Sequence, residues 1–489
     1  MMTNLKLFAP EIALTFFLCT LFVYDAVLPS LRKTLFPLIV IVFGMGLAIW
    51  ATADVATGVQ TYFSGMIAND GFGNFFRIFF FATAAICAIV AYGSKELETS
   101  GRTEFGLLLL CITFGLSLMA NATHLLTLYI GIETASILSF AMAGFARHTL
   151  RGNEASIKYL IFGALSSGLM IYGFSLIYGY TGSLQYAEIG KYLTAHADGR
   201  PLIVLFALFL IYGGIAYKIS AFPMHFWTPD VYEGTTSPVA TFFSVGPKAA
   251  GVAALIRFFL TACATKTGEG VWTSIPGLSL PNAVAMIAAV TMLIGNLSAI
   301  GQTNVKRILA YSSIAHVGYI LMGLVGMEKT GLTAILFYLV AYCLMNIGAF
   351  WVVGIVSDIK KSEDLSAFRG MGWSSPTLGV CMAVFLFSLT GIPMFSGFIG
   401  KFLLFGALLK APGFLWLAIF GVLNSVVSLY YYSKILKAMY FERDEQVVAL
   451  DLLPLHRAGL VLLAIPTVVL GLFFGPVIEF AEKAVLSFL

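Results

Sequence analysis

The chain has 489 residues, of which 59% are hydrophobic and 11% are charged. Soluble domains contain about 45–50% apolar and about 25% charged residues, so this composition excludes an ordinary soluble protein and predicts a polytopic membrane protein. The formal net charge of +4 is too small to suggest a nucleic-acid partner. We expect a single transmembrane bundle over residues 1–489.

Long apolar stretches follow one another along the whole chain. A transmembrane helix needs about 20 predominantly apolar residues, and by this measure the sequence predicts an all-α protein with about fourteen spans. The first stretch is too long for the apolar region of a cleaved signal peptide, and the twelfth is too long for one straight helix. The predicted spans are residues 9–28, 34–52, 75–94, 105–120, 123–146, 155–180, 201–226, 236–263, 280–301, 304–326, 331–357, 374–409, 412–440 and 456–476.

Lysine and arginine are distributed unevenly between the two sets of loops. Fifteen lie in loops that follow odd-numbered spans, and seven lie at the termini or after even-numbered spans. Because cytoplasmic loops carry the excess of these residues, both termini are predicted to face away from the cytoplasm. The fifteen include Arg32, Lys33, Arg147 and Arg443, and the seven include Arg200.

No sequence pattern indicates a cofactor or a metal ion held by this chain. Each of the six cysteines lies in an apolar stretch and none forms a Cys-x-x-Cys pair, so we interpret them as small buried hydrophobes rather than as ligands of zinc or an iron–sulfur cluster. A phosphate-binding Gly-x-x-x-x-Gly-Lys-Ser/Thr motif is missing from the sequence, and "GFGNF" at 71–75 is only a fragment of a dinucleotide fingerprint.

Four ionisable residues lie deep in predicted spans. Glu133 is in "YIGIETASILSF", Lys218 in "YKISAFPMHF", Lys248 in "SVGPKAAGVAAL" and Lys401 in "SLTGIPMFSGFIGKF". A charge at mid-bilayer costs at least about 2.5–3.5 kcal/mol and is a functional-site hypothesis by default. We interpret the four as candidates for an ion pathway. The alternative for Glu133 is a structural partner that neutralises a lysine.

Each of the three lysines is accompanied by a proline. A proline in a helix removes one N–H group and frees the carbonyl four residues earlier, and in a membrane that carbonyl needs another partner. Broken helices at an ion pathway are common in transporters, whereas the alternative is a kink beside a lysine that snorkels to the surface. The prolines are Pro223, Pro247 and Pro393, and the freed carbonyls would be those of Ile219, Phe243 and Leu389.

Five further ionisable residues lie within predicted spans or at their ends. His225 and His316 are candidate relay groups, since a neutral imidazole can pass a proton, or they are satisfied interior histidines. Lys158 lies near the start of its span, where it is an auxiliary pathway candidate or a snorkelling side chain. Lys306 and Arg307 stand at a predicted cytoplasmic end and are interpreted as topological anchors.

Spans 7 and 12 share an apolar helix, a proline and a mid-membrane lysine. Five spans separate the two, so the corresponding helices run in opposite directions. This pattern predicts an inverted repeat, with spans 4–8 (105–263) related to spans 9–13 (280–440) and with breaks in spans 7 and 12. Residues 1–104 would form three N-terminal helices, and 441–489 the last span and the C-terminus. Inverted repeats place the pathway near the midplane.

The stretch "YKISAFPMHFWTPDVYEGTTSPVATFFSVGPKAA" at 217–250 resembles the proton-translocating antiporter-like subunits of respiratory complex I. Those subunits carry a lysine, then Phe-Pro-x-His-x-Trp-x-Pro-Asp, and a second lysine one helix later. "LYIGIETASILSF" resembles their fifth-helix glutamate segment, "NVKRILAYSSIAHVGYILMG" their tenth helix, and "SLTGIPMFSGFIGKF" their broken twelfth helix. The match runs in order from about residue 105 to 440.

Within this family of NADH–quinone oxidoreductase subunits, the N branch is the most similar. Its twelfth-helix residue is lysine, as at Lys401, whereas the M branch has glutamate. The L branch carries a long C-terminal lateral helix, for which this chain leaves no room after its fourteenth span. The resemblance implies that Glu133, Lys218, Lys248 and Lys401 form the ionisable axis, with Lys158 and His225 as auxiliary candidates.

The resemblance also implies the surroundings of the chain. It would be a non-redox subunit in a bacterial plasma (inner) membrane, moving protons while quinone is reduced elsewhere. NADH, FMN, iron–sulfur clusters and quinone would be used by partner subunits, which include other membrane and peripheral subunits and neighbouring antiporter-like subunits. Two alternatives stay open: a subunit of a cation/proton antiporter or a membrane-bound hydrogenase, and an autonomous Na+(K+)/H+ antiporter. A redox-inert scaffold is a third class.

Overall fold

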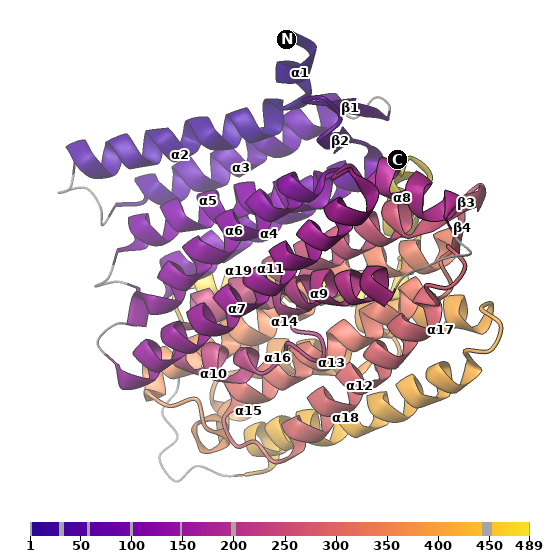
Figure 1. Ribbon diagram of the computed structural model, residues 1–489. Helices are drawn as coiled ribbons and strands as arrows, with labels where there is room; N and C mark the ends of the chain where they lie inside the picture. Colours follow the sequence, from indigo (N-terminus) through magenta and orange to yellow (C-terminus); the bar gives the residue numbers. More distant parts are fainter. Residues whose placement is uncertain are drawn as a thin grey trace.

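The computed structural model describes residues 2–28, 34–55, 59–97, 101–146, 149–196, 202–442 and 452–488. Over these residues the chain forms one bundle of helices that run side by side (Figure 1). Thirteen of the described helices are long and apolar enough to cross a membrane, or up to fourteen if a bent pair counts as one span. The prediction of an all-α polytopic membrane protein is therefore confirmed. Residues outside the described ranges include Arg32, Lys33, Arg147, Arg200 and Arg443, which entered the predicted topology.

The N-terminal group consists of three long helices and a β-hairpin. In the hairpin, strands β1 and β2 pair antiparallel, with Gln60 opposite Asn69. These elements are α1 (Met2–Leu7), α2 (Ala9–Val27), α3 (Phe36–Val55), β1 (Gln60–Tyr62), β2 (Ile67–Asn69) and α4 (Gly71–Gly93).

The next group covers the predicted first repeat. A second antiparallel hairpin follows its last helix, with Ala264 opposite Ser274. The elements are α5 (Arg102–Asn121), α6 (Leu125–Ala143), η2 (Gly144–Ala146), α7 (Leu150–Thr181), α8 (Tyr186–Ala195), α9 (Leu202–Ile219), α10 (Trp227–Gly234), α11 (Ser237–Ala262), β3 (Ala264–Gly268) and β4 (Val271–Ser274).

The third group covers the predicted second repeat. Whether the two groups are related by inversion stays a prediction, as do the segment boundaries derived from it. The elements are α12 (Leu280–Ile300), α13 (Val305–Val325), α14 (Lys329–Lys360), η4 (Leu365–Phe368), α15 (Met371–Ser374), α16 (Pro376–Thr390), α17 (Ser396–Leu409) and α18 (Leu415–Phe441).

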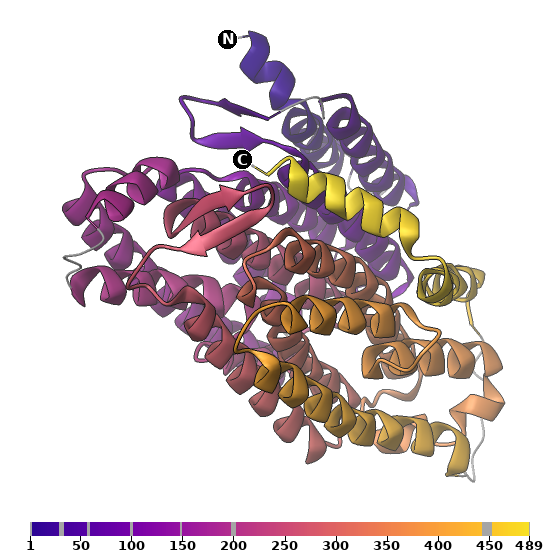
Figure 2. The ribbon, with the colours of Figure 1, turned by 90° about the vertical axis from the view of Figure 1, so that its right-hand side faces the viewer.

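Two helices follow, α19 (Pro454–Leu472) and α20 (Gly475–Leu486). Figure 2 shows α20 lying across the ends of the other helices, where it packs on α4 and α14. Both hairpins and the C-terminal end lie at this same end of the bundle (Figure 1).

Local sequence signals account for several helix ends. The Asp70 carboxylate accepts a hydrogen bond from the Gly73 N–H at 2.7 Å, and the Asn304 side chain accepts one from the Arg307 N–H at 3.0 Å, so these residues cap α4 and α13. Helix α7 ends at Gly182, whose φ of 72° is a left-handed conformation that glycine adopts without steric cost.

Three helices are enclosed by the others. The central windows of α11, α13 and α14 are 100%, 94% and 83% buried, compared with 33% for α2 and α7. A helix that is apolar on all sides belongs in such an interior. Polar residues in these central windows of α11 and α13 are therefore shielded from lipid and must find partners inside the bundle.

Two of the three predicted helix breaks are present, and the third is wrong. Pro223 lies between α9 and α10, and Pro393 lies between α16 and α17, but α11 continues through Pro247. Proline clashes with the β-carbon of the preceding residue when that residue is helical. Gly246 has no β-carbon, which removes this conflict at Pro247, but α19 also continues through Pro466, which follows Ile465. The clash alone therefore does not decide where a helix is interrupted.

Candidate functional site

Aromatic side chains satisfy the backbone at the first break. The Trp227 indole N–H donates to the Tyr217 carbonyl at 3.1 Å, and the Tyr212 hydroxyl donates to the Phe222 carbonyl at 2.8 Å. These two carbonyls at the break already have partners, and Lys218, one residue before the end of α9, bonds to neither of them. Its ammonium group remains available for a different partner.

Among the described residues, Lys218 makes no ion pair with Glu133 but bonds to a serine one helical turn away from it. The Lys218 side chain is buried, and its Nζ donates to the Ser136 hydroxyl at 3.0 Å. Ser136 follows Glu133 by one turn of α6, and the Glu133 Oε1 is buried without a hydrogen-bond partner among the described residues. A modest side-chain movement could replace the serine by the carboxylate as the partner of Lys218.

Lys248 lies in the middle of the enclosed helix α11. Its side chain is 2% exposed, and its Nζ donates to the Ser313 hydroxyl of α13 at 2.6 Å. The same Nζ lies 5.5 Å from the centre of the Tyr232 ring, a distance at which the ring face attracts a cation. A polar hydroxyl and an aromatic face thus hold this amine, and no ion pair to it is found among the described residues.

At the second break the lysine uses the exposed carbonyls directly. The Lys401 Nζ donates to the Leu389 carbonyl at 3.1 Å, to the Thr390 carbonyl at 2.8 Å and to the Ser425 hydroxyl at 2.9 Å. It also lies 4.6 Å from the centre of the Tyr319 ring. The Leu389 carbonyl is the one that Pro393 was predicted to free.

His316 lies on α13 between the partners of Lys248 and Lys401. Its Nδ1 bonds to the Tyr338 hydroxyl at 2.5 Å and its Nε2 to the Tyr432 hydroxyl at 3.2 Å. Ser313, His316 and Tyr319 are three residues apart and so lie along one side of the helix. Helix α13 therefore carries polar groups from one lysine to the next.

The two auxiliary candidates, His225 and Lys158, differ in burial and in their hydrogen-bond partners. His225 is buried in the first break, and its Nδ1 has no hydrogen-bond partner among the described residues. Lys158 is 37% exposed and forms ion pairs with Asp230 at 2.6 Å and Glu154 at 2.7 Å. A relay role for either residue stays a prediction.

Charged residues also gather at one end of the bundle. Arg307 bonds to both Asp230 and Glu233 at 2.8 Å, while the buried Lys306 bonds to the Glu363 carboxylate at 2.7 Å and the Thr235 carbonyl at 2.6 Å. Lys306 and Arg307 are therefore both held in ion pairs with residues of other segments. Their interpretation as topological anchors stays a prediction. Beside them a hollow of about 990 Å³ opens between the two main groups of helices.

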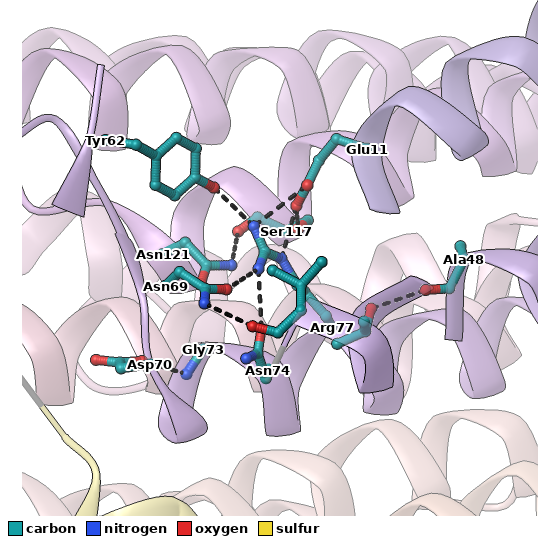
Figure 3. A network of polar contacts seen from close by, with 12 residues as sticks. Glu11, Ala48, Tyr62, Asn69, Asp70, Gly73, Asn74, Arg77, Ser117 and Asn121 are labelled. Atoms are coloured by element: carbon teal, nitrogen blue, oxygen red, sulfur yellow. Dashed lines mark hydrogen bonds and ion pairs between the residues drawn. The ribbon is translucent and has the colours of Figure 1, made fainter. Parts of the chain in front are cut away.

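A second polar network lies in the N-terminal group (Figure 3), beside the β1–β2 hairpin at the other end of the bundle (Figure 1). Arg77 is fully buried and donates to Glu11 at 2.8 and 3.2 Å and to the Tyr62 hydroxyl at 2.7 Å. The Glu11 carboxylate also accepts from Ser117 at 2.6 Å. Every N–H group of a buried guanidinium needs such a partner, and the side-chain oxygens of Asn69 and Asn74 accept the remaining hydrogen bonds at 2.9 Å.

A neighbouring ion pair joins this group to α11. Arg257 donates to both oxygens of Asp70 at 2.8 Å and to the Ala120 carbonyl at 2.7 Å. Asp70 also caps α4. The sequence shows Arg77 and Arg257 as charges within spans, which was a signal that they need partners, but it does not indicate which residues those partners are.

Sequence reasoning missed the hydroxyl groups that surround the lysines. Their only signal is that polar residues recur at intervals of three or four in spans that are otherwise apolar. Within the described residues, no group of three or more His, Cys, Asp or Glu side chains is placed to hold a metal ion. The missed hydroxyl residues are Ser136, Ser313, Tyr319, Tyr338, Ser425 and Tyr432.

Solved structures share this arrangement of helices. One chain of "Respiratory complex I from Thermus thermophilus with bound Aureothin" matches with a TM-score of 0.79 and 32% sequence identity, covering 96% of this chain and 98% of that one. A chain of the Mrp complex from Dietzia sp. matches with a TM-score of 0.84 and 22% identity, covering 99% and 98%. At 22% identity the second likeness concerns the fold alone.

Known sequences give a more specific result. The family "NADH:quinone oxidoreductase/Mrp antiporter, TM" matches residues 122–428. The NADH-quinone oxidoreductase subunit N 2 of Sorangium cellulosum is 42% identical over 99% of this chain and 97% of its own length. Subunit N of an Anaeromyxobacter species is 39% identical over 98% and 96%. This chain therefore belongs to the NADH-quinone oxidoreductase subunit N family.

Proposed function

We propose that this chain translocates protons across a bacterial plasma membrane as a non-redox subunit of NADH–quinone oxidoreductase. The observation that carries the proposal is the series of three buried lysines on α9, α11 and α17, each bonded to a serine hydroxyl. Membrane interiors exclude such charges unless a function requires them. Membership in the subunit N family supplies the reaction to which they would contribute.

Glu133 and Lys218 would act as a switchable pair. A carboxylate next to an amine favours the protonated form of the amine, and burial without a counter-charge disfavours it. When the two side chains approach, Lys218 holds its proton; when they separate, the proton passes to Lys248. The serine now bonded to Lys218 would be the resting partner in the separated state.

Lys248 would be the central relay and Lys401 the group that delivers protons to the far side or controls their exit. Between them, His316 and its two tyrosine partners offer exchangeable protons over the distance that separates α11 from α17. His225 and Lys158 would be auxiliary groups near Lys218.

The free energy for this transport would come from other subunits. Moving one charge against the membrane potential costs about 2.3 kcal/mol per 100 mV, which requires a coupled exergonic reaction. NADH, FMN, iron–sulfur clusters and quinone would be used by the partner subunits, and both termini of this chain would face the periplasm.

Replacement of Lys248 by methionine tests the proposal, because methionine has a similar length but no proton to transfer. In the assembled complex, reconstituted into vesicles, Lys248→Met should reduce proton uptake by on the order of a hundredfold, the range expected for losing a proton-transfer group. The matched control is Lys191→Met, because Lys191 is an exposed lysine in the middle of α8.

Near-normal pumping by the Lys248→Met complex would instead favour a redox-inert scaffold. Purification of the chain without flavin and iron–sulfur subunits, together with sodium- or potassium-driven proton movement, would favour a cation/proton antiporter or its subunit.

A further inference from the structure

Helix α11 carries a row of buried hydroxyl groups that leads to Lys248. We propose that this row, with Glu96 at its outer end, is an entry route by which protons from the hollow reach Lys248 in addition to those passed on by Lys218, and that Glu96 is the group that first accepts them. The inference rests on the proton-translocating function proposed above, and it adds a residue from the N-terminal group to that pathway.

The row is defined by spacing and burial. Ser237, Thr241, Ser244 and Lys248 are separated by four, three and four residues, which places them on one face of a helix. All four are at most 2% exposed. At 1.5 Å per residue the row extends about 16 Å along α11, from the first residue of the helix to its centre.

Glu96 stands where this row begins. Its carboxylate accepts hydrogen bonds from the Ser237 N–H at 2.6 Å and from the Ser237 hydroxyl at 3.0 Å. Glu96 comes from the segment after α4, which is fixed by the Asp358 carboxylate through the Lys95 N–H at 2.9 Å. A proton on Glu96 is therefore one hydrogen bond away from the first hydroxyl of the row.

The outer side of Glu96 is open to the hollow of about 990 Å³. Glu96, Thr235 and Thr236 line this hollow together with Lys306, Arg307 and Glu363. Water in a hollow of this size can bring protons to a carboxylate in its wall. The Glu96 carboxylate bonds to Ser237 at the start of α11, so the residue lies between the hollow and the buried row.

Several buried oxygen atoms near the row have no hydrogen-bond partner. Among the described residues, the hydroxyls of Thr235 and Thr236 and the Oδ1 of Asn346 are buried without a hydrogen-bond partner. The other amide atom of Asn346 donates to the Ser244 hydroxyl at 2.6 Å. Buried polar atoms in this condition are places where water binds, and such water would connect hydroxyls that are otherwise one helical turn apart.

A competing explanation is that Glu96 merely caps α11, and two substitutions separate the explanations. Glu96→Gln preserves an acceptor for the Ser237 N–H but cannot take up a proton. Glu96→Asp keeps an acid but shortens its reach by one methylene, which weakens the cap. In the reconstituted complex we expect Glu96→Gln to slow proton uptake by on the order of tenfold or more and Glu96→Asp to stay within about twofold of wild type.

The row itself is tested by Thr241→Val, which removes a hydroxyl at nearly constant volume. Thr52→Val on α3 is the matched control, since Thr52 is equally buried and also bonds to the carbonyl four residues earlier. We expect Thr241→Val to slow proton uptake severalfold and Thr52→Val to leave it unchanged, with both complexes fully assembled.

The outcomes are distinguishable from failure of the proposed function. If Lys248→Met abolishes pumping while Glu96→Gln and Thr241→Val pump like wild type, this route is wrong and the lysine relay stands. If Glu96→Asp is impaired and Glu96→Gln is not, Glu96 is a cap only. If Lys248→Met itself pumps normally, the proposed function fails.

Discussion

At the scale of single residues, the three lysines differ in how they are held. Lys401 bonds to two carbonyls at a helix break and to one serine, whereas Lys218 and Lys248 each bond to one serine hydroxyl. The sequence predicted that Pro393 would free the Leu389 carbonyl, and Lys401 is one of the groups near this break that bonds to it. It could not predict the serine partners, since these depend on which helix faces meet.

The bonds to Lys401 make a prediction about its replacement by arginine. Arginine would retain a cation for the two carbonyls, but guanidinium scarcely deprotonates, with a pKa above about 12. A fixed charge that only stabilises the break would accept this change, and a proton carrier would not. We therefore expect Lys401→Arg to assemble normally and to translocate protons about as poorly as Lys401→Ala.

Proton uptake in reconstituted vesicles measures this effect, with assembly checked separately. The exposed Lys410→Arg at the end of α17 controls for the substitution itself. Wild-type pumping by the Lys401→Arg complex would show that position 401 supplies only a permanent positive charge.

At the scale of helices, α4 and its flanking residues contact both ends of α11. Asp70, before α4, pairs with Arg257, and Glu96, after α4, bonds to Ser237. The two helices pack against each other along their length. The N-terminal group therefore fixes the position of α11, the helix that carries Lys248, relative to α4. The sequence did not indicate these contacts, because the bonded residues are more than 140 positions apart.

This arrangement predicts a large stability effect at Asp70. Asparagine can still cap α4, so Asp70→Asn mainly removes the buried charge that faces Arg257. Loss of one partner of a buried ion pair costs about 3–5 kcal/mol, and we expect a loss of that order in the free energy of unfolding. Denaturant titration of the purified chain in detergent measures it.

The double replacement Asp70→Asn with Arg257→Met is the informative control. Removing both charges leaves no unpaired ion, so much of the lost free energy of unfolding should return. A double variant less stable than either single variant would show that Arg257 is needed for its bond to Ala120 or for its packing rather than for its charge.

Helix breaks show where sequence reasoning succeeds and fails at this scale. Proline alone predicted three breaks, but only Pro223 and Pro393 interrupt their helices. The glycine before Pro247 removes the steric conflict that a β-carbon would cause, yet α19 continues through Pro466 although Ile465 carries a β-carbon. Proline and the residue before it are therefore not enough to predict a break, because tertiary packing can hold a helix together through a proline.

At the scale of the whole molecule, apolar length predicted the spans closely, because a bilayer imposes one thickness on every crossing helix. The tertiary neighbours of each span could not be predicted in this way, since all spans are similarly apolar. The two hairpins and the C-terminal end lie at one end of the bundle (Figure 1), and the hollow lined by Glu96 and Lys306 lies at the other. The bundle therefore presents two chemically different ends to the two sides of a membrane.

The excess of lysine and arginine, fifteen against seven, predicts that the end with the hollow faces the cytoplasm. Single cysteines replacing Ser362, which lines the hollow, and Ser487, at the C-terminal end, should then react with an impermeant thiol reagent from opposite sides of the membrane. The experiment needs a background without the six native cysteines, of which Cys19 is exposed. In intact cells only the cysteine at 487 should be labelled, and in inverted vesicles only the one at 362.

Labelling of both from the same side would mean that the number of spans between them is even rather than odd. Labelling on the two sides in the reverse order would place the hollow outside the cytoplasm, and Glu96 could then not accept protons for outward transport.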